Sequence, residues 1–220
     1  MNKLEIFIDT GDIGEIKKGL ELYPLTGITT NPIIFKKECK NRRDYFNLIE
    51  ELIKLPIEKV LIQVPGKTSF EMIKNARKVA DISNKITIKI PIDKKEGFNV
   101  INKLHKEGVK ALATELMNVT QAILAAYSNA EYVAPFMNFV EKAGRNSSLL
   151  IKNIRTVYDR IKTQTKIIAA DIKTISNFNE AVLNGADAAT LSYGLLDILG
   201  YDSLSREMGK IVNKNWSFYF

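Results

Sequence analysis

The sequence predicts a single (β/α)8 barrel over residues 1–220, with an added C-terminal helix and tail. Eight short runs rich in β-branched residues alternate with longer stretches of helical spacing, which is the order of a parallel sheet. Eight such units in 220 residues lie near the lower size limit of a closed barrel. No stretch rich in Gly, Pro or Ser marks a linker between domains. An open doubly wound sheet is the alternative, but no G-x-G-x-x-G turn follows any of the runs.

Each expected strand is a short apolar run, and each expected helix is a longer stretch with apolar residues at helical spacing. The strands are expected at residues 4–8, 26–29, 59–64, 86–90, 109–114, 130–135, 166–171 and 187–192, and helical stretches at 12–23, 43–55, 69–81, 95–108, 118–130 and 176–185. Asp12 and Ser69 are the expected N-caps of two helices. Gly108 and Gly185 follow two others, where a left-handed residue commonly ends a helix shortly before the next strand.

Composition disfavours several classes of protein. The chain carries 32 Lys and Arg against 25 Asp and Glu, a net charge of +7. Most lysines lie along expected helices, and the densest basic cluster, residues 35–46, lacks nucleic-acid-binding motifs and alternating aromatics, so we expect no nucleic acid partner. No apolar run approaches the ~18 residues of a membrane span, and the N-terminal residues do not resemble a signal peptide, so we expect no membrane association. The single cysteine, Cys39, excludes an intramolecular disulfide and agrees with a reducing cytoplasm.

Polar residues gather where the expected strands end, the rim at which (β/α)8 barrels hold their active sites. They are Asp9, Thr10, Thr29, Thr30, Asn31, Gln63, Lys89, Thr114, Glu115, Asp171, Thr190 and Ser192, with Lys173 just beyond. A threonine or asparagine after a strand is more often a turn residue or a helix cap, so each of these residues alone has a structural explanation. Their convergence on one rim predicts a polar site.

Lys89 lies at the centre of the apolar run ITIKIP, residues 86–91. On an edge strand a lysine discourages aggregation, whereas in a buried strand it is costly unless it is paired or neutral. Because side chains alternate along a strand, Ile86, Ile88 and Ile90 are expected to face the helices and Lys89 to point into the barrel. Desolvation lowers the pKa of a lysine, and a neutral amine is a nucleophile toward a carbonyl. The sequence therefore predicts Schiff-base chemistry at Lys89.

Such chemistry needs no cofactor, because the protonated imine itself accepts the electrons. Asp9 is suited to relay a proton, and Thr114 and Gln63 to position a water. No cluster of histidines and carboxylates indicates a metal, so we expect neither a cofactor nor a metal ion.

Five motifs in order resemble the transaldolase family: IDTGD at 8–12, GITTNPII at 27–34, TIKIP at 87–91, the segment from Thr114 to Phe136, and IIAADIKT at 167–174. The resemblance extends over essentially the whole chain and is strongest to the short subgroup that includes the fructose-6-phosphate aldolases. It implies a class I enzyme on a (β/α)8 barrel that cleaves a ketose between C3 and C4. The dihydroxyacetone unit then passes to an aldehyde or is released.

The resemblance also implies a role for each matching residue. Lys89 forms the imine, Asp9 transfers protons beside it, and Thr114 and Gln63 hold the catalytic water. The expected partner is a small sugar or sugar phosphate. The expected substrate contacts are Thr29, Asn31, Ala134, Phe136, Asp171, Lys173 and Ser192.

The sequence departs from the family where transfer and release are distinguished. Gln63 and Ala134 resemble the aldolases, since transaldolases usually carry Glu and Ser there. Phe136 resembles the transaldolases, since the aldolases usually carry an acid/base tyrosine. Release by water is weaker without that hydroxyl, so we favour a transaldolase; a lyase that releases dihydroxyacetone is the alternative.

Two further departures concern phosphate. The family usually has an arginine at the position of Phe139 and a serine at that of Asp171. Arginine binds phosphate through two hydrogen bonds, whereas a carboxylate repels it. We expect an altered phosphate-binding end that favours an unphosphorylated sugar or a different terminal group. The opposing interpretation is that Lys173, which is placed to pair with Asp171, and the basic residues 36–43 rebuild an anion site.

The chain ends in NKNWSFYF, which contains Trp216, Phe218, Tyr219 and Phe220. An exposed aromatic tail is unfavourable in a monomer, although it can also fold onto its own barrel. In the short subgroup the C-terminal helix reaches a neighbouring subunit, so we expect a homo-oligomer, a pentamer or decamer. A basic RNA-binding or scaffold protein that has kept the barrel and lost catalysis is the hypothesis from another class.

Overall fold

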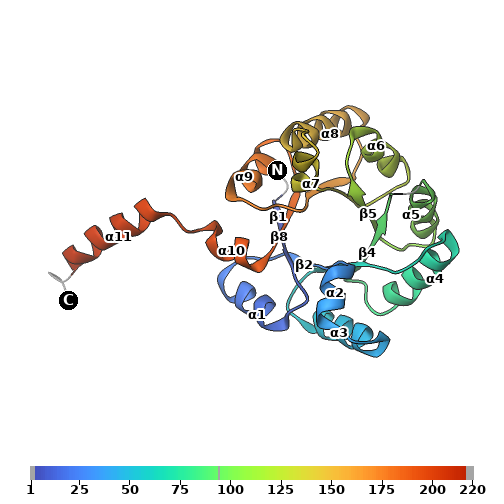
Figure 1. Cartoon of the computed structure of the whole chain (residues 1–220), viewed down its shortest axis with the longest axis horizontal. Helices are drawn as coiled ribbons and strands as arrows, with labels where there is room; N and C mark the ends of the chain where they lie inside the picture. Colours follow the sequence, from blue (N-terminus) through green and yellow to red (C-terminus); the bar gives the residue numbers. More distant parts are fainter. Residues whose placement is uncertain (1–2, 94, 217–220) are drawn as a thin grey trace.

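In the computed structural model, which describes residues 3–93 and 95–216, eight strands form one closed parallel barrel (Figure 1). The strands pair in chain order, and β8 closes the barrel by pairing in parallel with β1. The predicted fold class is therefore confirmed. The strands are β1 (Glu5–Asp9), β2 (Gly27–Thr29), β3 (Lys59–Gln63), β4 (Ile86–Pro91), β5 (Ala111–Leu116), β6 (Tyr132–Pro135), β7 (Lys166–Ala169) and β8 (Ala188–Leu191).

Helices surround this barrel. They are α1 (Ile13–Leu22), α2 (Pro32–Glu38), α3 (Arg42–Lys54), α4 (Ser69–Ala80), α5 (Glu96–Lys106), α6 (Val119–Tyr127), α7 (Met137–Lys142), α8 (Ser147–Ile161), α9 (Ile175–Leu183), α10 (Tyr193–Leu199) and α11 (Ser203–Trp216). The six expected helical stretches correspond to α1, α3, α4, α5, α6 and α9. The expected C-terminal helix corresponds to α11, and α2, α7, α10 and the long α8 come in addition.

Strand boundaries differ from the expected ones at the rim. β5 begins and ends two residues later than expected, since it continues through an irregular register to Leu116. β7 stops before Asp171, whose φ of 55° breaks the extended conformation. β8 stops before Ser192, because this residue already caps α10.

The helix ends agree with the sequence at three of four positions. The Asp12 carboxylate accepts hydrogen bonds from the main-chain nitrogens of Gly14 and Glu15, as an N-cap does. Gly108 and Gly185 have φ values of 76° and 96°, in the left-handed region. The expectation for Ser69 was wrong: the preceding residue, Thr68, caps α4 by accepting from the main-chain nitrogen of Glu71 at 3.2 Å, and Ser69 is the first helical residue.

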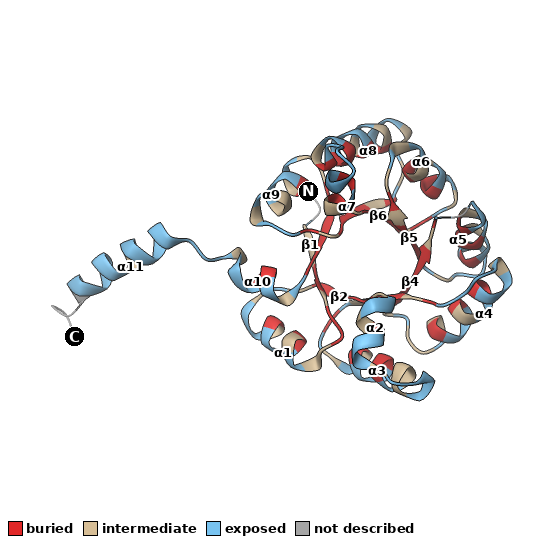
Figure 2. Ribbon diagram, in the orientation of Figure 1, coloured by how far each residue is buried: buried red, intermediate tan, exposed pale blue. Residues whose placement is uncertain are grey.

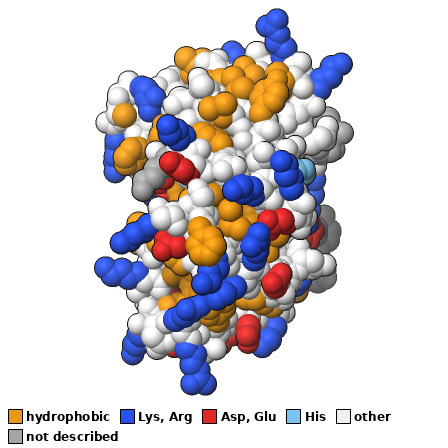
Figure 3. All heavy atoms as spheres, turned by 90° about the vertical axis from the view of Figure 1, so that its right-hand side faces the viewer, with side chains coloured by type: hydrophobic (Ala, Val, Ile, Leu, Met, Phe, Trp, Pro, Cys, Tyr) orange, Lys and Arg blue, Asp and Glu red, His pale blue; other side chains and the backbone are white. Residues whose placement is uncertain are grey.

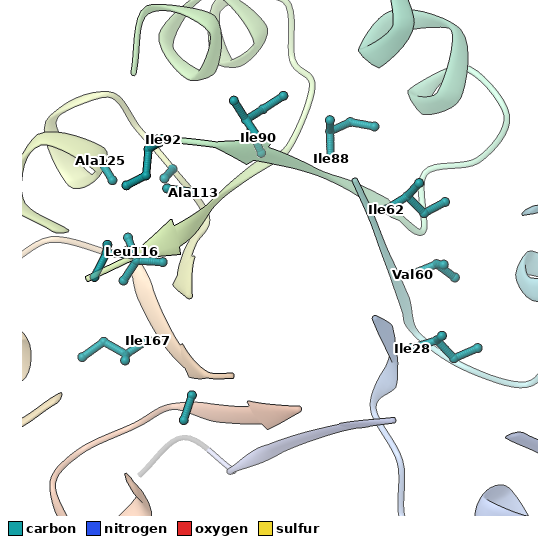
Figure 4. Close-up of a cluster of buried hydrophobic side chains, with 14 of the residues drawn as sticks. Ile28, Val60, Ile62, Ile88, Ile90, Ile92, Ala113, Leu116, Ala125 and Ile167 are labelled. Atoms are coloured by element: carbon teal, nitrogen blue, oxygen red, sulfur yellow. The ribbon is translucent and has the colours of Figure 1, made fainter. Parts of the chain in front are cut away.

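Side chains leave the barrel wall in two directions. Those that point outward, including Ile28, Ile62, Ile88 and Ile90, form the main core against the helices (Figure 4). Those that point inward fill the barrel, and Figure 2 shows the buried strands at its centre. The inner cluster consists of Phe7, Leu61, Leu112, Tyr132, Ala134, Ile168, Ala170 and Ala188.

A polar network closes the N-terminal mouth of the barrel. Glu5 accepts hydrogen bonds from Lys166 and from the hydroxyl of Tyr132, which in turn contacts Lys59. Lys59 also lies 3.6 Å from Glu131. The side chain of Glu5 is 14% exposed, so these charges are largely removed from water. At this end of a barrel such an arrangement supports stability, because active sites lie at the opposite end.

The helix α11 extends away from the barrel (Figures 1 and 2). Its exposed residues include Leu204, Met208, Ile211 and Val212, which form an apolar stripe at helical spacing. The alternative of a tail folded onto its own barrel therefore fails for this helix. The side chain of Trp216 and residues Phe218, Tyr219 and Phe220 lie outside the described part of the chain.

On the face formed by α4 and α5, lysine and arginine side chains are interspersed with acidic and hydrophobic ones (Figure 3). Across residues 3–93 and 95–216, no helix combines the length and the apolarity that crossing a membrane requires.

Candidate active site

The register of the barrel brings the polar strand ends together. Asp9 pairs with Thr29 across β1 and β2, and Gln63 pairs with Lys89 across β3 and β4. Thr114 of β5 lies opposite Pro91 of β4. The four expected catalytic residues therefore come from four strands and share the C-terminal half of the barrel.

Lys89 is buried inside the barrel, as the alternation along β4 predicts. Its side-chain nitrogen donates a hydrogen bond to the main-chain oxygen of Thr30 at 2.7 Å, and the residue is 7% exposed. Desolvation lowers the pKa of Lys89, while the negative charges of Asp9 and Glu115 oppose this shift. Burial prevails, so the neutral amine is more accessible than in an ordinary lysine.

Asp9 is held by a short chain of hydroxyl groups. The Thr29 hydroxyl donates to an Asp9 carboxylate oxygen at 2.6 Å and lies 2.5 Å from the Thr190 hydroxyl. Since Thr29 has only one hydroxyl hydrogen, Thr190 must donate to Thr29. Thr190 of β8 was expected at the rim, but it was not among the residues expected to act in catalysis or to contact the substrate.

A bulge in β5 directs two consecutive polar residues toward the site. Ala113 pairs with Val133 and Leu116 with Pro135. Thr114 and Glu115 therefore both face the single β6 residue that lies between Val133 and Pro135. Ala113 and Leu116 both belong to the outer core, which leaves the two polar residues to the inner side. A bulge of this kind cannot be read from an alternating pattern, so the sequence placed Glu115 at the rim without assigning it a role in the site.

The two residues of the bulge differ in their contacts. The Thr114 hydroxyl is buried and makes no hydrogen bond within the described residues. The Glu115 carboxylate accepts a hydrogen bond from the Gln63 side-chain nitrogen at 3.2 Å. Glu115 also lines a pocket of about 190 Å³ together with Lys67 and Asp93. The site thus contains one unpaired buried hydroxyl and one amide held by a carboxylate.

Two expected substrate contacts cap helices. The side-chain oxygen of Asn31 accepts from the main-chain nitrogens of Ile33 and Ile34 at 2.9 and 3.0 Å. Within the described residues its side-chain nitrogen makes no hydrogen bond. Ser192 is exposed and caps α10 through a 3.4 Å bond from the nitrogen of Leu195. These two residues therefore have the structural role that their place after a strand suggests.

At the far side of the rim, the Asp171 carboxylate is engaged on both oxygens. One lies 2.9 Å from the Lys173 ammonium, so the expected pairing is present, and the other accepts from the Asn138 amide at 3.2 Å. Asn138 was not among the expected site residues. Phe136 is half-buried against the inner cluster, whereas Phe139 is 58% exposed. The basic charge of Lys173 is thus balanced by the neighbouring carboxylate.

The part of the chain that the structure describes contains no group of three or more His, Cys, Asp or Glu side chains suited to hold a metal ion. The site is defined instead by a buried lysine with two nearby carboxylates at the C-terminal mouth of a parallel barrel. A fold and site of this kind define a barrel enzyme.

The chain belongs to the transaldolase/fructose-6-phosphate aldolase family, whose model matches residues 6–217. It is an enzyme of the aldolase and transaldolase type. A protein of Dehalococcoides mccartyi described as "Probable transaldolase" is 36% identical over 194 residues, covering 88% of each chain. A "Probable transaldolase" of Thermoplasma volcanium is 33% identical over 89% of this chain and 87% of its own. A third, from Hydrogenobaculum sp., is 30% identical over 96% and 99% of the two chains.

Among solved structures, a thiamine phosphate pyrophosphorylase from Pyrococcus furiosus resembles this one with a TM-score of 0.64. The likeness covers 90% of this chain and 94% of the other at 15% sequence identity. At this identity the similarity concerns the fold alone.

Proposed function

We propose that this protein is a class I transaldolase-type enzyme that cleaves a ketose between C3 and C4 and transfers the dihydroxyacetone unit to an aldehyde. The observation that carries the proposal is the burial of Lys89 inside the barrel. Its side-chain nitrogen donates a hydrogen bond to an uncharged main-chain carbonyl. Desolvation lowers its pKa and makes the neutral amine available as a nucleophile. The family membership supports the same chemistry.

The reaction begins with attack of the neutral Lys89 nitrogen on the ketose carbonyl carbon, C2. Loss of water from the resulting carbinolamine gives a protonated imine, and Thr114 and Gln63 are suited to hold this water. Asp9 then takes the proton of the C4 hydroxyl as the C3–C4 bond breaks. The bonding electrons pass into the imine to form an enamine, and an aldehyde leaves.

The second half reverses these steps with another aldehyde. The enamine carbon attacks the carbonyl carbon of the acceptor, and the new alkoxide recovers a proton from Asp9. Thr29 and Thr190 belong to the hydroxyl chain that holds Asp9, and Asn31 follows β2 two residues after Thr29; all three are suited to contact hydroxyls of the three-carbon unit. Hydrolysis of the imine finally frees the product and regenerates the amine. Every step uses only groups of the protein and water.

The acceptor end is proposed to favour a sugar without a terminal phosphate. Asp171 adds a negative charge there, and the nearest cation, Lys173, is already paired with it. Phe139 offers an apolar surface in place of an arginine. The family itself implies sugar-phosphate substrates, so this property would distinguish the protein from its relatives.

Borohydride trapping tests the Schiff base. The protein is incubated with dihydroxyacetone, fructose or fructose 6-phosphate, reduced, and analysed by intact and peptide mass. We expect a three-carbon adduct on Lys89, with a larger yield from fructose than from its phosphate. Lys89→Met is the control and should give no adduct. Absence of any adduct from the folded protein would overturn the proposal, and salt-sensitive nucleic-acid binding by such a protein would favour a non-catalytic role.

Phe136 provides the test between transfer and release. A phenyl ring cannot exchange a proton, so we propose that the enamine waits for an acceptor aldehyde and is not efficiently protonated for release. Phe136→Tyr adds a hydroxyl at the same place, next to the inner cluster. We expect this variant to release more dihydroxyacetone in the absence of an acceptor. A wild-type protein that already releases it rapidly would be a lyase, the alternative function.

We further propose that residues 1–220 act as one domain within a cytoplasmic homo-oligomer, a pentamer or decamer. The exposed apolar stripe of α11, formed by Leu204, Met208, Ile211 and Val212, supports a neighbouring subunit as its cover. Light scattering coupled to size exclusion measures the mass. Met208→Asp together with Val212→Asp should lower the mass to that of smaller species. A wild-type monomer would contradict the proposal.

A further inference from the structure

We propose that Glu115 is a positioning residue that fixes the orientation of the Gln63 amide for the catalytic water. The inference rests on the proposed function and deepens it. It starts from the contact between the Glu115 carboxylate and the Gln63 side-chain nitrogen, 3.2 Å apart.

The backbone of Glu115 is held in an uncommon conformation. Its φ of 65° lies in the left-handed region, which favours Gly, Asn and Asp and is unusual for glutamate. The conformation occurs at the bulge where Thr114 and Glu115 together face one residue of β6. Without the additional residue, the position after Thr114 would point outward among the helices. Bulges near active sites redirect side chains in this way, and local strain tends to persist where it serves the site.

The carboxylate determines how the amide points. An ionised carboxylate only accepts hydrogen bonds, so Gln63 must present its nitrogen to Glu115. The amide oxygen is then free to accept a hydrogen bond from a water, and the buried Thr114 hydroxyl supplies a second polar contact. Without Glu115, the amide can rotate and present a donor to the water, which suits imine formation and hydrolysis less well.

Glu115 also belongs to the charged surroundings of the amine. The charges that act on Lys89 are those of Asp9 on β1 and Glu115 on β5. Glu115 itself shares its pocket with Lys67 after β3 and Asp93 after β4. Replacement of Glu115 therefore has two separable effects, one on the amide and one on the proton affinity of Lys89.

A double-mutant cycle isolates the first effect. Glu115→Ala, Gln63→Ala and the double variant are compared by kcat with the donor that gives the best adduct. If Glu115 acts through Gln63, Glu115→Ala lowers kcat about 10-fold alone and less than about 2-fold when Gln63 is already replaced. An equal loss in both backgrounds would overturn the proposal. Thermal unfolding of each variant confirms that the folded protein is compared.

Glu115→Gln separates the charge from the hydrogen bond. The new amide oxygen can still accept from Gln63, so kcat at the optimum should recover most of the Glu115→Ala loss. The acidic limb of the pH profile, where activity rises as Lys89 loses its proton, should nevertheless move to lower pH because one negative charge is gone. Failure of this recovery would show that the amide orientation is not the role of Glu115.

Asp93→Asn is the matched control. It removes a carboxylate from the same pocket, but within the described residues this carboxylate makes no hydrogen bond with Gln63. Its effect on kcat should be the same whether or not Gln63 is present. The trapping experiment on the wild-type protein tests the proposed function separately. If the wild-type protein forms the adduct but the cycle shows no coupling, only the inference about Glu115 fails.

Discussion

The side-chain nitrogen of Lys89 on β4 lies 2.7 Å from the main-chain oxygen of Thr30, the residue that follows β2, so the contact passes over the intervening strand β3. The acceptor is uncharged, so this bond holds the amine in place without stabilising the ammonium as a carboxylate would. Thr30 is itself fixed, because its main-chain nitrogen donates to the oxygen of Leu61. The amine is therefore positioned rigidly while its pKa remains lowered by burial.

Lys89→Met should stabilise the protein at neutral pH. Burial lowers the folded-state pKa of Lys89 below 10.5. The cost to the free energy of unfolding is therefore largest at pH values below that folded pKa, where the buried amine is protonated. Stability is gained as the pH rises from the folded pKa toward the unfolded one. Burying an ammonium costs several kcal/mol, against about 1–3 kcal/mol for leaving the Thr30 oxygen unpaired.

Thermal unfolding at pH 7 measures this effect. The melting temperature of Lys89→Met should rise by roughly 2–4 °C per kcal/mol gained, while activity is lost. The exposed Lys17 on α1 is the control, and Lys17→Met should change the melting temperature little. A clear fall for Lys89→Met would show that burial of the lysine carries no cost.

Asp9→Asn should impair cleavage more than imine formation. The amide oxygen can still accept from Thr29, so the geometry of the 2.6 Å contact is kept. The variant loses the proton acceptor, and kcat should fall about 100-fold or more. It also loses a negative charge that raises the pKa of Lys89, so the acidic limb of the trapping profile, where adduct formation rises with pH, should move to lower pH.

Asp12→Asn is the matched control for Asp9→Asn, because Asp12 lies nearby but caps α1. This exchange should leave kcat nearly unchanged, since asparagine is an equally good cap. A loss of the dihydroxyacetone adduct in Asp9→Asn would contradict the assignment of Asp9 to proton transfer alone.

Phe139→Arg combined with Asp171→Asn should convert the acceptor end to phosphate binding. Asparagine tolerates the left-handed φ of 55° at position 171, and the exposed position 139 accepts a longer side chain. The exchange removes one negative charge and adds one cation. We expect kcat/KM for fructose 6-phosphate relative to fructose to rise about 10- to 100-fold.

Lys173→Ala in the wild-type background tests the opposing interpretation. If Lys173 serves as an anion site, its removal should selectively weaken use of the phosphorylated substrate. If it only neutralises Asp171, as the 2.9 Å contact suggests, both substrates should be affected alike.

Glu5→Gln should destabilise the barrel without a direct effect on catalysis, because Glu5 lies at the opposite mouth. Burial raises the pKa of Glu5, but the hydrogen bonds from Lys166 and Tyr132 and the charges of Lys59 and Lys166 outweigh it and leave this pKa below 4.5. The stabilising contribution is therefore present above the unfolded value and is lost as the pH falls through the folded pKa. At pH 7 the loss should be about 1–3 kcal/mol.

Urea unfolding with and without Lys166→Met checks this prediction. Removing Lys166 as well relieves one uncompensated cation, so the double variant should lose less than the sum of the two single losses. Additive losses would mean that the two side chains do not interact.

The barrel and its chemistry were largely predictable from local sequence. The eight apolar runs, the helical stretches between them and the two left-handed glycines follow from side-chain periodicity and backbone sterics. The inward direction of Lys89 follows from alternation along a regular strand. The caps at Asn31 and Ser192 were a recognised alternative, since such residues commonly end strands and begin helices.

The sequence by itself determined the closed barrel, the buried lysine and the family to which the chain belongs, because each depends on periodic or contiguous patterns. Only the tertiary structure decided the contacts of Glu115 with Gln63, of Thr190 with Thr29 and of Asn138 with Asp171. The first depends on a bulge that breaks the two-residue period, and all three join residues far apart in the chain. Such contacts arise only when the closed barrel brings separate strand ends to one rim, which no local pattern encodes.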